Sequence, residues 1–260
     1  MWSRALWLLP WLLACGGSDT TTGRPIALAN AVRAAPEIAG PFATETGWTV
    51  QLSKAAVSIG ALYYFDGEPA FVRREAPTRW LASALGLGIA RAHPGHYFAG
   101  IAVGQMTTPS FADLLADTTM LPAGDGISGA FRSARLQLAT AEREPALSML
   151  GGGVAIAEGI ARNGTREVFF RVRASFDDVA RSVSQGAVDG CVFEEADVEG
   201  DGVVTMTVVP HVWFNLVDFT DVAAGSTVAP TELTAGSTAQ IAFSLGVAQL
   251  SAYRFAFAPL

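Results

Sequence analysis

Apolar and polar residues alternate along many short runs of the chain, which is the period-two pattern of half-buried β-strands. The clearest region spans residues 154 to 173, where two nine-residue runs flank Asn163-Gly164. Because Asn-Gly is a preferred central pair of a type I′ turn, this region predicts a β-hairpin. One face of its return strand is apolar at Val168, Phe170 and Val172.

A second long run begins at Trp48 and alternates cleanly until its apolar phase slips by one residue at Lys54-Ala55. A slip of one residue inside a strand pattern is what a β-bulge produces, so we expect a bulge there. The run continues to Asp66-Gly67, a dipeptide typical of tight turns.

Other segments complete the predicted set of elements. Alternation predicts strands over residues 25–33, 131–138, 188–193, 203–209, 239–247 and 252–257. Short helices are expected over residues 110–115 and over residues 175–184, the latter with Ser175 as its N-cap. Gly124-Asp125-Gly126 predicts a turn.

About nine or ten short strands with turn signals between them favour an all-β fold, an antiparallel β-sandwich with a few short helices. A β-barrel is the alternative, because the last strand alternates Tyr253, Phe255 and Phe257. We assign residues 25–260 to one domain. Residues 142–153, which are rich in charges and glycine, are interpreted as a loop between two sheets of that domain.

The first fifteen residues carry a specific motif. Arg4 precedes a short apolar run that is too short to span a bilayer permanently, and Leu12-Leu13-Ala14-Cys15 ends it. This motif resembles the lipobox of bacterial lipoproteins. The resemblance implies that residues 1–14 are a signal peptide and that Cys15 carries the lipid, palmitate among its acyl chains. An ordinary secretory signal that contains a cysteine is the alternative.

A lipid on Cys15 would anchor the chain to the membrane of a bacterial cell envelope. Residues 15–24 are rich in glycine, serine and threonine and are interpreted as a flexible tether. Gly16 stands where some bacteria place an aspartate for inner-membrane retention, so we expect the outer membrane, with the domain facing the periplasm or the surface. Only Lys54 is lysine among 17 basic residues, a bias that indicates a high-GC bacterial genome.

Composition excludes some functions. Of 260 residues, 50% are hydrophobic, and the formal charge is −7, so nothing favours nucleic-acid binding, which needs a basic face. The chain has no Gly-x-Ser-x-Gly, no P-loop and no His-Glu-x-x-His, and we expect no enzyme activity.

Two of the three histidines bracket one predicted turn, His93-Pro94-Gly95-His96. Imidazoles held this close favour a transition-metal site, with copper most plausible, completed by His211 or by a methionine such as Met106. Met120, Met206 and Cys191 are further soft candidates. A β-rich envelope protein with few histidines is faintly similar to the methanobactin-associated copper-binding proteins. A polar exposed turn without metal is the alternative.

A second candidate site is the acidic segment that ends in Asp201-Gly202. Its carboxylates, Asp197, Glu199 and Asp201, have the spacing of the start of a calcium loop. The twelfth position is Val208 rather than glutamate, so this is no EF-hand, and at most weak calcium binding is expected. A simple Asp-Gly hairpin turn is the alternative.

The rival function needs no metal. If aromatic side chains such as Trp48, Trp80 or Trp213 were exposed together, they would favour an interaction module that binds a glycan or a protein. Cys191 has no cysteine partner once Cys15 is lipidated, and it is interpreted as a small buried hydrophobe, with metal ligation as the alternative.

Overall fold

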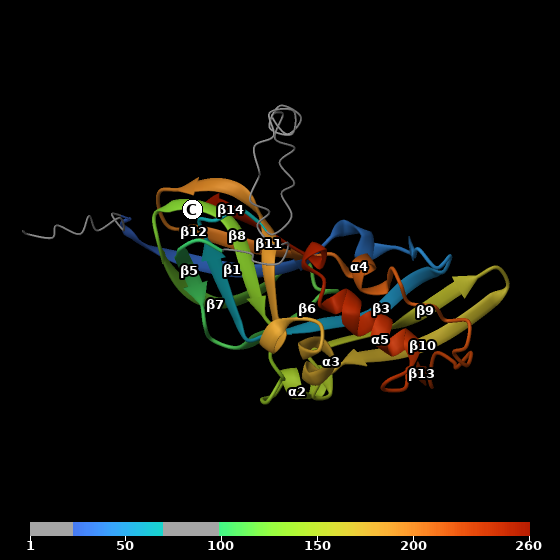
Figure 1. Ribbon diagram of the computed structural model, residues 1–260. Coiled ribbons are helices and arrows are strands. Elements are labelled where there is room, and N and C mark those ends of the chain that lie inside the picture. Colours follow the sequence, from blue (N-terminus) through green and yellow to red (C-terminus); the bar gives the residue numbers. More distant parts are fainter. Residues whose placement is uncertain (1–22, 70–98) are drawn as a thin grey trace, which may run out of the picture.

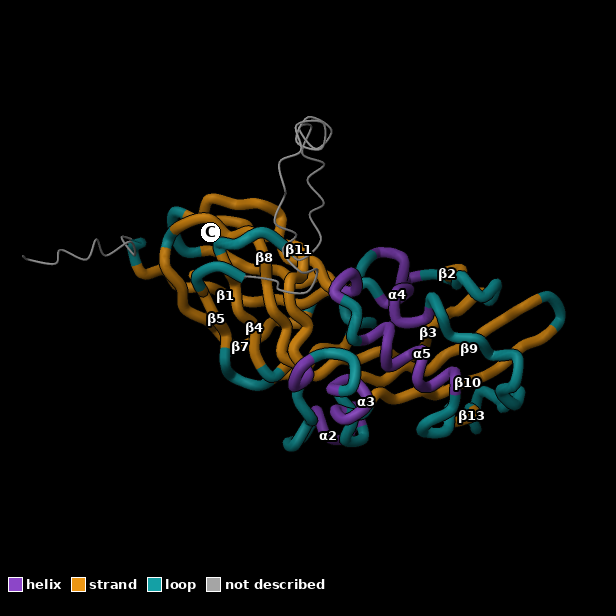
Figure 2. Tube along the Cα trace, in the orientation of Figure 1, coloured by secondary structure: helices purple, strands orange, loops and turns teal. Residues whose placement is uncertain are grey.

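The computed structural model describes residues 23–69 and 99–260. It consists of a closed β-barrel beside a sheet that carries most of the helices (Figures 1 and 2). In spatial order the barrel strands are β1 (Pro25–Ala34), β12 (Gly202–Val208), β14 (Tyr253–Pro259), β11 (Ala187–Val198), β8 (Gly129–Gln137), β4 (Ala61–Phe65), β5 (Ala102–Met106) and β7 (Thr119–Ile127).

The second sheet follows the order β13 (Thr231–Glu232), β10 (Arg166–Ala174), β9 (Ala155–Asn163), β3 (Thr49–Ile59) and β2 (Phe42–Ala43), and β6 (Ser110–Asp113) also pairs with β3. The helices are α2 (Ala146–Leu150), α3 (Phe176–Ala180), α4 (Pro210–Phe214) and α5 (Thr238–Val247). Short 3₁₀ turns are η1 (Pro36–Ala39), η2 (Ser184–Gly186) and η3 (Leu250–Ala252).

The predicted all-β class is confirmed, and the closed barrel is the alternative architecture that the final strand favoured. Most strand pairs are antiparallel, but three pairs are parallel: β1 with β12, β11 with β14, and β10 with β13. Residues 142–153 connect β8 of the barrel to β9 of the second sheet, as the interpretation of a loop between two sheets requires, and they include the short helix α2.

Aromatic side chains fill the barrel. The rings of Tyr64, Phe131, Phe193 and Phe255 contact one another with centroids 5.6 to 6.2 Å apart. Buried Asn30 lies among them and accepts a hydrogen bond from the hydroxyl of Tyr64. Its amide donates at 3.1 Å to two backbone carbonyls, so the polar groups inside the barrel are satisfied.

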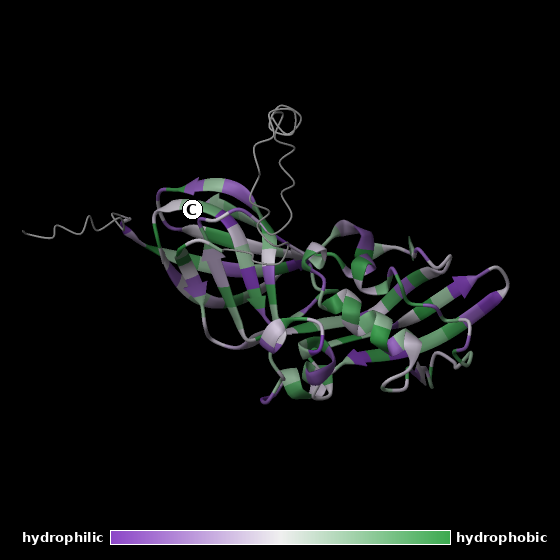
Figure 3. Ribbon diagram, in the orientation of Figure 1, coloured by the Kyte–Doolittle hydropathy of each residue, from purple (hydrophilic) through white to green (hydrophobic). Residues whose placement is uncertain are grey.

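One face of the second sheet packs against α4 and α5. Phe170 on β10 lies 5.5 Å from Phe214 and 4.9 Å from Phe219, ring centroid to centroid. Trp213 and Phe214 both contact Phe243 on α5. Figure 3 shows the hydrophobic colour of α5 along this face. The buried residues of barrel and sheet form one contiguous cluster, so the two halves share a core.

The halves meet where β3 passes into β4. Gly60 alone separates the two strands, and its amide donates to the carbonyl of Gln137 at 2.7 Å. A Cβ at Gly60 would lie 2.8 Å from the Cβ of Ala139, so the close approach of the β8–α2 connection requires glycine here.

Several local predictions are confirmed. The register of β3 against β9 shifts between Leu52 and Lys54, which is the predicted bulge. Ser175 caps α3 through a capping box with Asp178. The hairpin of β9 and β10 is present, but Asn163 pairs with Arg166, so Gly164 and Thr165 form the turn. Within it only Gly164 has positive φ, at 58°, which is the pattern of type II′ rather than type I′.

Three predicted elements are wrong. Residues 110–115, predicted as a helix, contain strand β6, because pairing with β3 overrides the weak local preference. Gly124-Asp125-Gly126 is no turn but lies within β7. A Cβ at Gly124 would lie 2.2 Å from the carbonyl oxygen of Gln105 on β5, so glycine permits close strand approach.

The third error is the predicted strand over residues 239–247, which is helix α5. Ser237 caps it by accepting a hydrogen bond from the Gln240 amide. The buried positions include Ala239, Ala242, Phe243, Gly246 and Val247. These positions are spaced as on one side of a helix, but the same residues also fit the period-two alternation from which a strand was predicted.

The buried pair of Tyr64 and Asn30 gives a prediction for stability. Tyr64→Phe removes the only donor to the Asn30 carbonyl oxygen among the described residues, and we expect a loss of about 1–3 kcal/mol in the free energy of unfolding. Tyr63→Phe, on the neighbouring partly exposed residue, is the matched control and should cost less than about 0.5 kcal/mol. Urea unfolding measures both. Equal losses in the two variants would contradict this role of the buried pair.

Candidate functional site

The face of the second sheet that the large helices leave open carries a row of charged side chains. They come from four adjacent strands: Lys54 on β3, Glu158 on β9, Arg171 and Arg173 on β10, and Glu232 on β13. We call these five residues the charged row. Helix α2 covers one end of the same face, where Leu150 packs with Ala56 and Ile156.

The sequence sets the positions of this row through alternation. On β10, Val168, Phe170 and Val172 point into the core, so Arg171 and Arg173 point out. On β3, the bulge at Ser53 moves Lys54 onto the open face while Ala55 stays buried. Arg171 lies directly opposite Glu158 on one side and Glu232 on the other, because the two registers fix both partners.

The centre of the row is a paired carboxylate. Arg171 donates from Nε and Nη2 to the two oxygens of Glu158 at 2.8 and 3.2 Å, which is bidentate geometry. The ammonium of Lys54 lies 3.6 Å from the same carboxylate. Partial burial acts to raise the pKa of Glu158, but the hydrogen bonds and charges of Arg171 and Lys54 outweigh it, and the pKa is lowered. Glu158 is therefore a carboxylate at neutral pH, with both oxygens engaged.

Arg173 is held differently. Its Nη1 lies 3.6 Å from a carboxylate oxygen of Glu232, beyond hydrogen-bond distance, and its Nε is buried without a hydrogen-bond partner in the described part of the chain. The guanidinium lies against Gly151, the left-handed residue that ends α2. A Cβ at Gly151 would lie 3.1 Å from the Arg173 Nε and 3.2 Å from its Cζ, so glycine leaves room for the guanidinium.

A cavity of about 320 Å³ lies elsewhere, and two further openings meet at Arg173 and Gly151. The first, about 230 Å³, is lined by Lys54, Glu158, Arg171 and Arg173 together with the end of α2. We call it the basic cleft. The second, about 380 Å³, lies beside Asp177, Asp178 and Glu232. The side chain of Arg173 therefore separates a cation-lined cleft from a more acidic one.

The floor of the second opening is a satisfied polar network. Buried Gln240 donates to the backbone carbonyl of Arg173 at 3.1 Å and to the carboxylate of Asp178 at 2.9 Å. Desolvation acts to raise the pKa of Asp178, but hydrogen bonds from Ser175 and Gln240 outweigh it and lower that pKa. This network ties α3 and α5 to β10 and fixes the backbone that carries Arg173.

The predicted copper residues lie in separate places. His93 and His96 fall outside the described residues. His211 is partly buried in α4, with its ring centroid 6.4 Å from that of Phe42, and Met106 is buried in the barrel wall on β5. Within residues 23–69 and 99–260, no three histidine, cysteine, aspartate or glutamate side chains are grouped so as to hold a metal ion. The copper site stays a prediction.

Other soft candidates are also placed. Met206 is buried, whereas Met120 is exposed. Cys191 is fully buried in the core, and desolvation, with the charge of Asp189 adding to it, raises the pKa of its thiol to about 12. The thiol is therefore protonated at neutral pH and behaves as a small buried hydrophobe. Cys15 lies outside the described residues.

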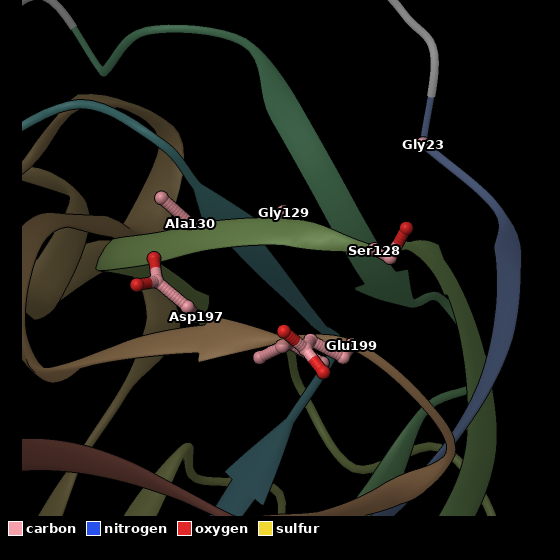
Figure 4. Close-up of a pocket in the computed structure, with 7 residues that line it drawn as sticks. Gly23, Ser128, Gly129, Ala130, Asp197 and Glu199 are labelled. Atoms are coloured by element: carbon pink, nitrogen blue, oxygen red, sulfur yellow. The ribbon is translucent and has the colours of Figure 1, made fainter.

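The acidic turn lies at the barrel end near Gly23 (Figure 4). Figure 4 shows the side chains of Asp197 and Glu199 on the segment below Gly129 and Ala130, where they line the cavity of about 320 Å³. Asp201 already serves the fold, since its carboxylate accepts a hydrogen bond from the Ala27 amide at 2.8 Å. Weak calcium binding at Asp197, Glu199 and Asp201 stays a prediction.

Sequence reasoning missed the charged row, although one signal pointed to it. The apolar face of the return strand already implies that Arg171 and Arg173 share the opposite face. The predicted turn at Asn163-Gly164 would place Ile156 opposite Arg171, and only the observed turn at Gly164-Thr165 places Glu158 there. What no pattern in the sequence gives is the position of α2 and Gly151 against Arg173, because that contact is tertiary.

Comparisons with protein-family models, with curated proteins and with solved structures find no match to this chain. None of the helices in the described residues is both long and apolar enough to cross a membrane. The geometry of the charged row and the sequence motifs are therefore the features that indicate a function.

The lowered pKa of Glu158 predicts a pH-dependent contribution to stability. Its stabilising effect is complete above the ordinary glutamate pKa and is lost as the pH falls through the lower pKa of the folded state. We expect Glu158→Gln to cost about 1 kcal/mol at pH 7 and to match the wild type in strong acid. Glu167→Gln, which removes the more exposed cross-strand pair with Arg162, is the control and should cost less. A cost for Glu158→Gln that does not change with pH would contradict this account.

Proposed function

We propose that the chain is a bacterial envelope lipoprotein, anchored through Cys15, that binds a protein or glycan partner through the open face of its second sheet and carries out no catalysis. The observation that carries this proposal is the gathering of the charged row on a sheet face that the helices of the described residues leave open except at the end covered by α2. The lipobox Leu12-Leu13-Ala14-Cys15 supports the anchor.

The arrangement of the two halves supports an anchor on the barrel side and a binding surface on the second sheet. The described chain enters at Gly23, at the end of the barrel remote from the second sheet (Figure 1). An anchor that precedes Gly23 by a short tether would leave the sheet pointing away from the membrane. The barrel interior is filled with aromatic rings, so the barrel serves as a scaffold.

The open face has the composition of a recognition surface. Partly exposed Ile160 and Phe169 lie on it beside the amide side chain of Gln51 and the arginines of the charged row. Apolar contact area beside arginine is typical of protein and glycan interfaces, where arginine and aromatic residues contribute most of the binding energy.

Site-specific photo-crosslinking in cells of the source bacterium tests the proposal. A photoreactive residue at Gln51, exposed on the open face, should form a discrete adduct, whereas the same residue at Gln105, exposed on barrel strand β5, should not. Mass spectrometry of the crosslinked peptides identifies a protein partner, and an adduct that muramidase removes is a cell-wall glycan. Absence of an adduct at Gln51, or equal adducts at both positions, would overturn the proposal.

The control for the anchor is Cys15→Ala in the same cells. This variant cannot be lipidated, so it should leave the detergent phase, while the parent protein should stay there with an acylated residue 15 by intact mass. If the parent carries an unmodified residue 15, the lipoprotein assignment fails, whatever the crosslinking shows.

A second candidate function is copper binding at the His93-Pro94-Gly95-His96 turn, favoured by the placing of two of the three histidines around one bend. Cu(I) and Cu(II) are titrated separately against a competing chelator. The affinity should fall as the pH drops through about 6.5, because imidazole must be neutral to bind. Unchanged binding in the His93→Ala, His96→Ala double variant would exclude this site, and His211→Ala tests the third ligand.

A further inference from the structure

The starting observation is that Arg173 has a buried donor without a hydrogen-bond partner. Arg173 Nε is buried and has no hydrogen-bond partner among the described residues, and its nearest carboxylate, that of Glu232, lies 3.6 Å from Nη1. A buried donor left unpaired keeps its desolvation cost without a compensating hydrogen bond, so folded proteins rarely leave one without a reason. Such a donor indicates that a bound ligand supplies the missing hydrogen-bond acceptor.

The charged side chains around Arg173 indicate the charge of that acceptor. Lys54, Arg171 and Arg173 line the basic cleft against one carboxylate, Glu158, which leaves a net charge of +2. Glu158 does not compete for Arg173, because both of its oxygens already accept from Arg171 and it faces Lys54 as well. The cleft therefore carries a surplus of positive charge in a protein whose formal charge is −7.

The shape of the cleft suits a small planar or tetrahedral group. Its volume is about 230 Å³, and Gly151 has no Cβ to crowd the guanidinium of Arg173. The guanidinium offers its donors in a rigid fork that matches the oxygens of a carboxylate or a phosphate. The capped and hydrogen-bonded segment beside Arg173 holds its backbone in place, through Gln240 and Asp178.

We propose that the basic cleft binds an oxyanion, a carboxylate or a phosphate group carried by the partner, with Arg173 as the direct ligand and Lys54 supplying further positive charge. This inference deepens the proposed function, on which it rests, by naming the chemical group recognised at the open face. Arg171 keeps its bidentate pair with Glu158 and forms the wall of the cleft.

The test uses the full-length protein in a neutral detergent at constant ionic strength. Inorganic phosphate and succinate are titrated separately, with calorimetry and the nitrogen–proton NMR signal of Arg173 Nε as readouts. We expect saturable binding of at least one anion and a shift of the Nε signal. Phosphate binding alone identifies a phosphorylated partner, and succinate binding alone a carboxylate-bearing one.

Two variants locate the binding. Arg173→Gln should weaken it by about tenfold or more, since a charge-assisted hydrogen bond is lost, and Arg173→Lys should weaken it less because the charge remains. Arg162→Gln removes an arginine from the same sheet face outside the cleft and should change the affinity by less than about twofold. Melting temperatures establish that each variant folds.

Two results would overturn the inference. One is the absence of saturable binding by either anion, and the other is equal binding in the Arg173→Gln and Arg162→Gln variants. Neither result touches the crosslinking at Gln51, which depends on the open face as a whole. Crosslinking without anion binding would leave the interaction module and remove only the oxyanion site.

Discussion

The register of β3 against β9 is the constraint on which both halves of the molecule depend. The bulge between Leu52 and Lys54 keeps Ala55, Val57 and Ile59 in the core while it turns Lys54 to the open face. A slip of one residue in a strand exchanges its two faces, so without the bulge the lysine would be buried and the core residues exposed. The chain continues from β3 through Gly60 into β4 of the barrel, so the exchange of faces would extend into the barrel.

Sequence patterns predicted the elements that local chemistry determines. The bulge, the hairpin and the Ser175 cap all follow from a few adjacent residues. The errors lie where distant strands decide the outcome: residues 110–115 become strand β6 because β3 is beside them, and the glycines at 124 and 126 serve strand approach rather than a turn. Alternation cannot distinguish glycine in a turn from glycine under a neighbouring backbone.

The charged row was within reach of the same reasoning, but its geometry was not. Alternation assigns Arg171 and Arg173 to one face, but the pairing of Arg171 with Glu158 follows only from the observed turn at Gly164-Thr165, because a turn centred on Asn163-Gly164 would place Ile156 opposite Arg171. Nothing in the local sequence says that Arg171 is saturated while Arg173 is not. That difference arises because Glu232 forms ion pairs with Arg171 at 4.0 Å and with Arg173 at 3.6 Å but a hydrogen bond with neither, and because Gly151 brings the end of α2 against only Arg173.

The uneven distribution of charge affects how an anionic group approaches the molecule. A chain with a formal charge of −7 repels anions on average, so a cleft whose lining carries a surplus of two positive charges differs locally from that average. The acidic residues Asp197, Glu199 and Asp201 lie at the barrel end near Gly23, remote from the second sheet (Figures 1 and 4). An anionic group approaching the molecule is therefore disfavoured at that end and attracted at the sheet, which orients the encounter before any contact forms. Because this orientation acts through solvent, salt screens it, whereas the short contacts of the partly buried Arg173 are screened less.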